Sequence, residues 1–107
     1  AVLTEVAYLD ISYNQVAALP ELDMECHLQQ FYASYNLIED VSMLAGLPEL
    51  TYVNVDYNEN LEEIECLNAC HLLVQVDAFG TKVAEVKLLT DMGVIVNFTP
   101  VVNEEDD

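Results

Sequence analysis

Residues 31–38 read FYASYNLI, and the Tyr-Asn pair in this stretch recurs in DISYNQV (10–16) and VNVDYNEN (53–60). The three asparagines, Asn14, Asn36 and Asn58, follow one another at intervals of 22 residues. An aromatic residue and an amide that return together at one interval indicate an internal repeat. A repeat decides the fold before any single element does, because its units are copies of one structural design.

Four units align on these asparagines, and each carries apolar residues at the same six positions. All 24 of these positions are filled, although only 53% of the chain is apolar. The third unit has one extra residue within 59–60, and Thr81 stands in the asparagine position of the fourth. The apolar positions are Val6, Leu9, Ile11, Val16, Leu19, Leu22; Leu28, Phe31, Ala33, Ile38, Val41, Leu44; Leu50, Val53, Val55, Leu61, Ile64, Leu67; and Leu73, Val76, Ala78, Val83, Val86, Leu89.

The spacing of these residues changes within each unit. Leu9-x-Ile11 and its counterparts alternate with the period of a short β-strand. The next apolar residues fall three apart, as in Val16 and Leu19, which predicts tight turns of the 3₁₀ kind rather than a full α-helix. A unit of this kind buries its apolar edge only by stacking on its neighbours, so we expect a stack of strand-and-turn units.

This pattern resembles the leucine-rich repeat family, whose repeat reads L-x-x-L-x-L-x-x-N-x-L. The 22-residue period is similar to the short class found in bacterial internalins and eukaryotic phosphatase regulators. The resemblance covers residues 3–98. It implies an α/β fold: a right-handed solenoid with a parallel β-sheet on its concave face and short 3₁₀ or irregular turns on its convex face.

The repeats set the expected domain boundaries. We expect a repeat domain over residues 1–98, ending in a closing strand that contains Val94, Val96 and Phe98, and an acidic exit segment or linker over 99–107. The chain does not begin with Met, and no polar cap precedes Val6. Terminal repeats normally have such a cap, so we expect the chain to be part of a longer protein.

The repeated asparagine has a structural explanation. It ends each strand where the chain turns, and its amide can donate to and accept from backbone groups that the turn leaves unpaired. Stacked units would align these side chains in one column. We therefore predict a structural ladder of Asn14, Asn36, Asn58 and, with fewer bonds, Thr81.

The positions marked x in the strand portion of the repeat point away from the core, towards the concave sheet. All six tyrosines of the chain fall at such positions, together with several acids. Tyrosine is favoured at binding hot spots, so the face is a candidate protein-binding surface. Cross-strand tyrosine pairs can also serve only to stabilise a sheet, and that alternative stays open. The candidate residues are Tyr8, Asp10, Tyr13, Tyr32, Tyr35, Tyr52, Asp56, Tyr57, Asp77 and Phe79.

The charge of the chain is strongly one-sided, with 20 acidic residues against Lys82 and Lys87 and a formal net charge of −18. Nucleic acids and anionic membrane surfaces are disfavoured as partners, because both require clustered Lys and Arg. The field would instead steer basic partners to the chain.

Two Cys-His pairs, Cys26-His27 and Cys70-His71, raise the possibility of a metal site. In the repeat frame they lie two units apart, about 10 Å on the spacing of adjacent strands, which is too far for one tetrahedral zinc ion. We therefore expect no metal site and no cofactor. No histidine is placed with a nucleophile and a carboxylate, so we do not expect an enzyme.

We expect a non-catalytic protein-interaction module that binds a partner, a basic one on charge grounds, through its concave face. The alternatives are a structural spacer or arm of a larger surface protein, and a carbohydrate-binding surface. The internalin-like resemblance favours a bacterial cell surface or secreted location, whereas the three cysteines, an odd number, favour the cytoplasm.

Overall fold

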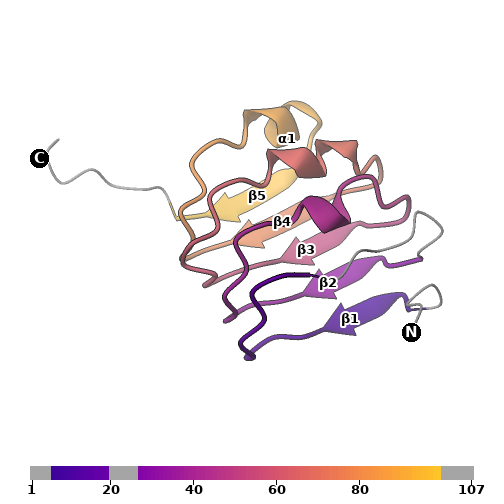
Figure 1. Cartoon of the computed structure of the whole chain (residues 1–107). Helices are drawn as coiled ribbons and strands as arrows, with labels where there is room; N and C mark the ends of the chain where they lie inside the picture. The colour runs from indigo at the N-terminus through magenta and orange to yellow at the C-terminus, as the bar shows by residue number, and fades with distance from the viewer. Residues whose placement is uncertain (1–5, 20–26, 100–107) are drawn as a thin grey trace, which may run out of the picture.

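The structure is a computed structural model that describes residues 6–19 and 27–99. It is a small α/β-type domain built on one five-stranded sheet, in which the strands follow chain order and all neighbours are parallel (Figure 1). This confirms the predicted class and the parallel sheet. The strands are β1 (Tyr8–Asp10), β2 (Gln30–Tyr32), β3 (Tyr52–Asn54), β4 (Gln75–Ala78) and β5 (Ile95–Phe98).

The register of the sheet follows the sequence units. The first four strands each come from one unit, and their inward residues Leu9, Phe31, Val53 and Val76 are direct partners in the ladder. The extra residue of the third unit follows its asparagine and therefore does not shift the pairing of β3 with β4. The outward columns agree with the prediction: Tyr8, Gln30, Tyr52, Gln75 and Asp10, Tyr32, Asn54, Asp77.

Among the described residues, the segments between strands lie on one side of the sheet, and none of their helical turns covers the other side (Figure 1). Two of them contain the expected 3₁₀ turns, η1 (Ser42–Leu44) and η2 (Glu65–Ala69). The fourth unit differs from the expectation, because it forms a short α-helix, α1 (Lys87–Asp91). There the Thr90 amide donates to the carbonyl of Val86, four residues earlier, and the Lys-Leu-Leu sequence favours this helical turn.

The core lies between the sheet and these segments, and the repeated apolar positions fill it. Those of the second and third units are essentially inaccessible, with 0–2% of their surface exposed. The first unit is less covered because β1 is the outermost strand, so Val6, Leu9, Ile11 and Val16 are only partly buried. Leu22 lies outside the described residues. Leu47, Cys70 and Val94 join the core although they are not among the aligned apolar positions.

The closing strand predicted around Val94, Val96 and Phe98 is present as β5, which pairs with β4. The predicted domain of residues 1–98 and the exit segment 99–107 stay predictions, since residues 1–5, 20–26 and 100–107 lie outside the described part.

Candidate functional site

Three tyrosines form a ladder across the uncovered face of the sheet, which we call the face ladder. Tyr8 on β1, Tyr32 on β2 and Tyr52 on β3 occupy two adjacent outward columns, so their rings zigzag between strands. The ring centroids of Tyr8 and Tyr32 are 5.0 Å apart, and those of Tyr32 and Tyr52 are 5.1 Å apart. The ring planes are tilted by 39° and 48°, and both centroid distances lie within the range that aromatic pairs prefer.

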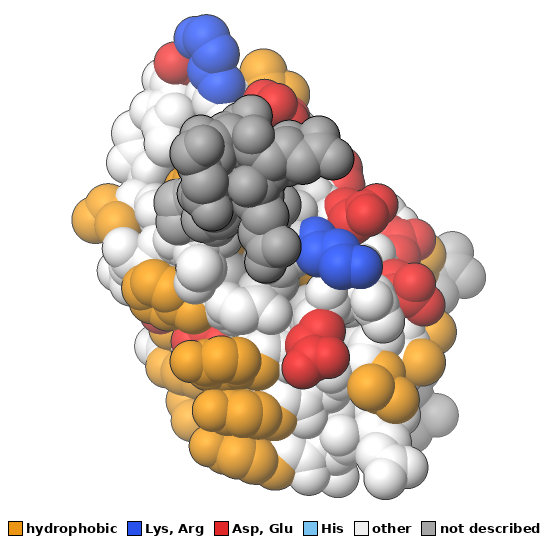
Figure 2. All heavy atoms as spheres, turned by 90° about the vertical axis from the view of Figure 1, so that its left-hand side faces the viewer, with side chains coloured by type: hydrophobic (Ala, Val, Ile, Leu, Met, Phe, Trp, Pro, Cys, Tyr) orange, Lys and Arg blue, Asp and Glu red, His pale blue; other side chains and the backbone are white. Residues whose placement is uncertain are grey.

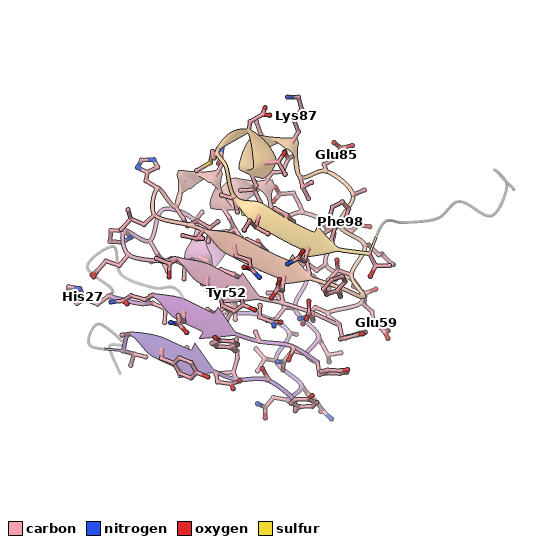
Figure 3. The ribbon with its side chains drawn as sticks, turned by 180° about the vertical axis from the view of Figure 1, so that it is seen from behind. His27, Tyr52, Glu59, Glu85, Lys87 and Phe98 are labelled. Carbon is pink, nitrogen blue, oxygen red and sulfur yellow. The ribbon has the colours of Figure 1, made fainter. Side chains whose placement is uncertain are left out.

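The face ladder ends in a polar network centred on Asp77 of β4. The hydroxyl of Tyr52 donates to this carboxylate, as do the side-chain amides of Gln75 (3.0 Å) and Asn97 (2.9 Å). Figure 3 shows Tyr52 over the middle of the sheet. Asp77 therefore holds a tyrosine in place from the neighbouring strand.

These contacts shift the titration of both partners. Burial on its own would raise the pKa of Asp77, but the hydrogen bonds donated by Tyr52, Asn97 and Gln75 outweigh it and hold this pKa below its ordinary value. Burial, and then the bond to Asp77, raise the pKa of Tyr52 to about 12. At neutral pH the pair is a phenol donating to a carboxylate.

The other three tyrosines form a second ladder where the chain leaves the strands, which we call the edge ladder. The rings of Tyr13 and Tyr35, and of Tyr35 and Tyr57, are stacked with centroids 4.6 Å apart. Although stacked, the three remain 75%, 45% and 46% exposed. Figure 2, which looks onto this edge, shows hydrophobic side chains layered at the lower left, with acidic side chains next to the layers and on the right.

All three edge tyrosines have a left-handed backbone, with φ of 62° at Tyr13, 58° at Tyr35 and 60° at Tyr57. For a residue with a side chain this conformation costs about 1–2 kcal/mol. Each offset ring pair returns about 0.5–1.5 kcal/mol, so stacking offsets much of the strain. The left-handed residue turns the chain at the end of its strand, and this turn takes the three side chains to the edge.

The edge ladder ends at the fourth unit, as Gly80 occupies the tyrosine position there with φ of 68°. A Cβ atom added to Gly80 would lie 2.4 Å from Cδ1 of Tyr57. The Tyr57 ring thus lies against the glycine backbone on one side and against Tyr35 on the other.

The asparagine column lies directly behind the edge ladder. The Asn58 amide donates to the carbonyls of Ala33 (3.0 Å) and Val55 (2.9 Å), and its Oδ1 accepts the Ile38 N–H (2.9 Å). Asn36 repeats this arrangement with Ile11, Ala33 and Val16. Each side chain therefore joins its own unit to the preceding one.

The two ends of the column make fewer bonds. Asn14 is exposed and donates to Ile11 (2.7 Å) and Ser12 (3.1 Å), both in its own unit. Thr81 donates to Ala78 (2.8 Å) and accepts from Val83 (3.2 Å), also within its unit. Its hydroxyl is too short to reach the third unit in the way that Asn58 reaches the second.

The two remaining candidate acids differ from Asp77. Asp10 is exposed, and the N–H of Ser12, which donates to it at 2.9 Å, holds its pKa below the ordinary value. Asp56 is half-buried and accepts the N–H of Phe79 at 2.7 Å. Burial raises the pKa of Asp56, the Phe79 bond opposes the rise, and the charge of Asp77 adds to it.

A pocket of about 260 Å³, which we call the edge pocket, opens beside the edge ladder. Tyr35, Tyr57 and the exposed Leu37 form its apolar walls, and Glu59 supplies a carboxylate. The amides of Asn14, Asn36 and Asn60 complete it. In Figure 3, Glu59 lies beyond the ends of the strands, at the opposite edge from His27.

The predicted binding face is thus divided in the structure. The six tyrosines form two ladders rather than one surface, and no ring contact joins the two. Strand alternation correctly predicts the outward positions of Tyr8, Tyr32 and Tyr52. The column that Tyr13, Tyr35 and Tyr57 share in the repeat predicts a stacked ladder, and this ladder is present. Their left-handed backbone ends the alternation, so the ladder lies at the edge of the sheet and not on the same face. Phe79 is exposed at 42%, and its backbone carbonyl accepts the Tyr57 N–H (2.6 Å).

Sequence reasoning missed Asn97, which binds Asp77, and three residues of the edge pocket: Leu37, Glu59 and Asn60. Asn97 lies outside the four aligned units, so no unit spacing marks it. The pocket residues follow the repeated asparagines directly. An exposed leucine next to Asn36 was the available signal, because the same position is polar in the first and third units.

The thiols that the structure describes are packing groups. Cys70 is buried and donates to the Leu44 carbonyl (3.1 Å), and Cys66 is half-buried. Burial raises the pKa of both thiols, to about 12 at Cys66, where Glu63 adds to the effect. Cys26 lies outside the described residues, and His27 contacts Glu49. Within residues 6–19 and 27–99, no three His, Cys, Asp or Glu side chains cluster as metal ligands would.

Comparisons with known proteins do not assign the site. No protein-family model matches the chain, and a search of curated proteins finds no significant match. None of the helical segments within the described ranges has the length and apolar character of a membrane span.

Proposed function

We propose that this chain is a leucine-rich-repeat solenoid and acts as a non-catalytic module that binds a basic segment of a partner protein. The solenoid reading is supported by strands that come from successive units and pair in register. It is also supported by the asparagines that join each unit to the preceding one.

The two tyrosine ladders carry the binding proposal. Tyrosine gives a large contact area at low entropic cost, and neighbouring rings that hold each other in place reduce that cost further. Tyr8 is 57% exposed at the end of the face ladder, and Tyr13 is 75% exposed at the end of the edge ladder. Within the described part of the chain, these end rings have a ring neighbour on one side only, so the other side offers contact area to a partner.

The charges indicate the kind of partner. A net charge of −18 attracts basic segments over a long range. Asp10 is exposed and stands in the sequence between Tyr8 of the face ladder and Tyr13 of the edge ladder. Asp77 contributes differently, because it already accepts three hydrogen bonds and fixes the orientation of Tyr52.

The geometry favours a peptide over a sugar. Sugar rings bind on exposed aromatic faces, but both faces of Tyr35 are covered by its neighbours in the stack. Tyr57 is covered by Tyr35 and by Gly80. Tyr35 and Tyr57 therefore present ring edges and hydroxyl groups, which suit the mixed apolar and polar surface of a peptide.

An array of peptides that spans net charges from strongly acidic to strongly basic tests this function. We expect basic peptides to bind, and the double variant Tyr8→Ser, Tyr13→Gly to weaken them by about tenfold. The control is Leu72→Ser, which removes a residue of similar exposure, 55%, outside both ladders. A blank array, or equal weakening by the control, would favour the spacer alternative.

A further inference from the structure

The edge pocket combines an apolar wall with oxygen acceptors on separate residues. Tyr35, Tyr57 and Leu37 supply the apolar part, and Leu37 keeps 55% of its surface exposed although it is a large aliphatic residue. Glu59 supplies the one carboxylate of the lining. A pocket of this composition fits a ligand with an aliphatic stem and a positively charged, hydrogen-bonding head.

The amide oxygens of the lining differ in availability. Oδ1 of Asn36 already accepts the N–H of Val16. Oδ1 of Asn14, the corresponding atom one unit earlier, accepts no hydrogen bond from any described residue, and Asn14 uses its amide nitrogen for both of its bonds. Asn60 Oδ1 accepts only a long bond, 3.4 Å, from Lys82 of this chain. Oδ1 of Asn36 faces the unit before its own, so the corresponding oxygen of Asn14 faces away from the third unit. Oδ1 of Asn60, the residue after Glu59, is therefore the amide oxygen available next to that carboxylate.

Two acceptors on adjacent residues, the Glu59 carboxylate and Oδ1 of Asn60, distinguish between arginine and lysine as ligands. A guanidinium group carries five N–H donors in a plane and can serve several acceptors at once. A lysine ammonium is a compact, strongly hydrated charge that pairs with fewer groups. The position of Lys82 at Asn60 shows that a cationic side chain reaches this rim.

We propose that the edge pocket binds an arginine side chain of the partner protein. The arginine stem lies along Tyr35, Tyr57 and Leu37, while the guanidinium pairs with Glu59 and donates to Oδ1 of Asn60. This assignment rests on the proposed peptide-binding function and names the residue that the partner presents.

A titration with single amino-acid amides tests the pocket without the partner. N-acetyl-arginine amide is added to the ¹⁵N-labelled chain, and two-dimensional NMR spectra follow the backbone signals of Leu37 and Glu59 and the side-chain amide of Asn60. We expect these signals to move together. N-acetyl-lysine amide should require a concentration about threefold higher, and N-acetyl-leucine amide should leave Glu59 unmoved.

Two variants separate the pocket from the overall charge. Glu59→Gln is expected to weaken arginine-amide binding by about threefold. Glu62→Gln changes the net charge equally at an exposed position outside the pocket lining and should leave the affinity unchanged. Unmoved pocket signals at saturating arginine amide, equal affinity for lysine, or equal weakening by the two variants would overturn the proposal. Backbone spectra of both variants verify that they fold.

The outcomes also separate this inference from the proposed function. If the chain binds basic peptides on the array but arginine amide leaves the pocket signals unmoved, the pocket assignment alone is wrong. If no peptide on the array is bound but arginine amide binds at Glu59, the proposed function is wrong and the pocket is a site for a free guanidinium compound.

Discussion

Tyr13, Tyr35 and Tyr57 occupy a backbone conformation that glycine adopts at no cost, and Gly80 does adopt it in the fourth unit. Glycine would form the turn without strain, so tyrosine at these three positions indicates that the side chain itself makes a contribution. Within the fold, that contribution is ring stacking. At the surface, it is the exposed contact area on which the proposed function depends.

The left-handed backbone makes an unusual prediction for Tyr35. Tyr35→Ala and Tyr35→Gly lose the same two ring contacts, but only alanine keeps the strain of φ 58°. We expect the glycine variant to be more stable than the alanine variant by about 1 kcal/mol, measured by urea unfolding. Elsewhere glycine is the less stable of the two. The reverse order here would show that the left-handed conformation is not present.

Asn58 and Asn14 form a matched pair for the structural column. Asn58→Ala leaves the Ile38 N–H and the Ala33 and Val55 carbonyls without their partner in the core, so we expect a loss of about 3 kcal/mol. Asn14→Ala removes two bonds at an exposed site, and about 1 kcal/mol or less should be lost. Urea unfolding midpoints of the two variants test this. Equal losses would contradict the linking role of Asn58.

The two half-buried aspartates should respond to pH in opposite ways. The pKa of Asp77 is lowered on folding, so its charged form contributes stability above its unfolded value, about 3.9, and this is lost as the pH falls through the folded pKa. Asp77→Asn should therefore destabilise the chain at pH 7. The pKa of Asp56 is raised, so its charged form opposes folding at pH 7, and Asp56→Asn should stabilise.

Thermal midpoints of the two variants between pH 7 and pH 3 test these signs. The Asp56→Asn difference should vanish as the pH falls below about 3.9, where Asp56 is protonated in the folded and the unfolded state. The Asp77→Asn difference should shrink at lower pH still, as the pH falls through the lowered folded pKa of Asp77. Destabilisation by Asp56→Asn at pH 7 would show that its bond to Phe79 outweighs its burial.

The turn after β4 tests how closely the edge ladder fits the fourth unit. Gly80→Ala adds both backbone strain at φ 68° and a contact of 2.4 Å with the Tyr57 ring. Gly93→Ala adds strain at φ 87° alone, because nothing lies within 4 Å. We expect Gly80→Ala to cost about 1 kcal/mol more in unfolding experiments. Equal costs would mean that the Tyr57 ring moves aside freely.

The strands and their register could be predicted from sequence, because each inward position such as Phe31 or Val53 is apolar and the asparagine fixes its place in the unit. The division of the tyrosines could not be predicted in the same way, since nothing in a tyrosine indicates a left-handed backbone. Gly80 in the same column was the one available sign, because glycine favours that conformation.

Two other features depend on contacts between distant segments. The α-helical form of α1 rests on a bond between Thr90 and Val86 that competes closely with the 3₁₀ pattern, and the repeat spacing does not distinguish the two. The link between Asp77 and Asn97 arises because β5 pairs with β4 outside the unit spacing. The edge pocket likewise needs residues from three units brought together.

At the scale of the whole molecule, the acidic residues far outnumber the basic residues that could neutralise them. The net charge is −18, and the described residues hold only two ion pairs, His27–Glu49 and Lys87–Asp91. At 1 M NaCl the screening length falls to about 3 Å, so repulsion between surface carboxylates is reduced. We expect the thermal midpoint to rise by about 4 °C or more, measured by circular dichroism.

Acid provides the control for this salt effect. Near the isoelectric point of about 4.1 the net charge vanishes, and the gain from NaCl should shrink with it. A gain of the same size at both pH values would point to ion binding or a general salt effect on apolar burial instead of screened repulsion.

The chain contains six tyrosines and no tryptophan. Its near-ultraviolet absorption therefore comes mainly from the tyrosines of the two ladders, with no tryptophan to obscure them. Three rings stacked at 4.6 Å couple electronically, so near-ultraviolet circular dichroism and tyrosine emission should differ from those of six isolated phenols. The molecule carries a built-in optical reporter, which can follow unfolding and peptide contact without any attached label.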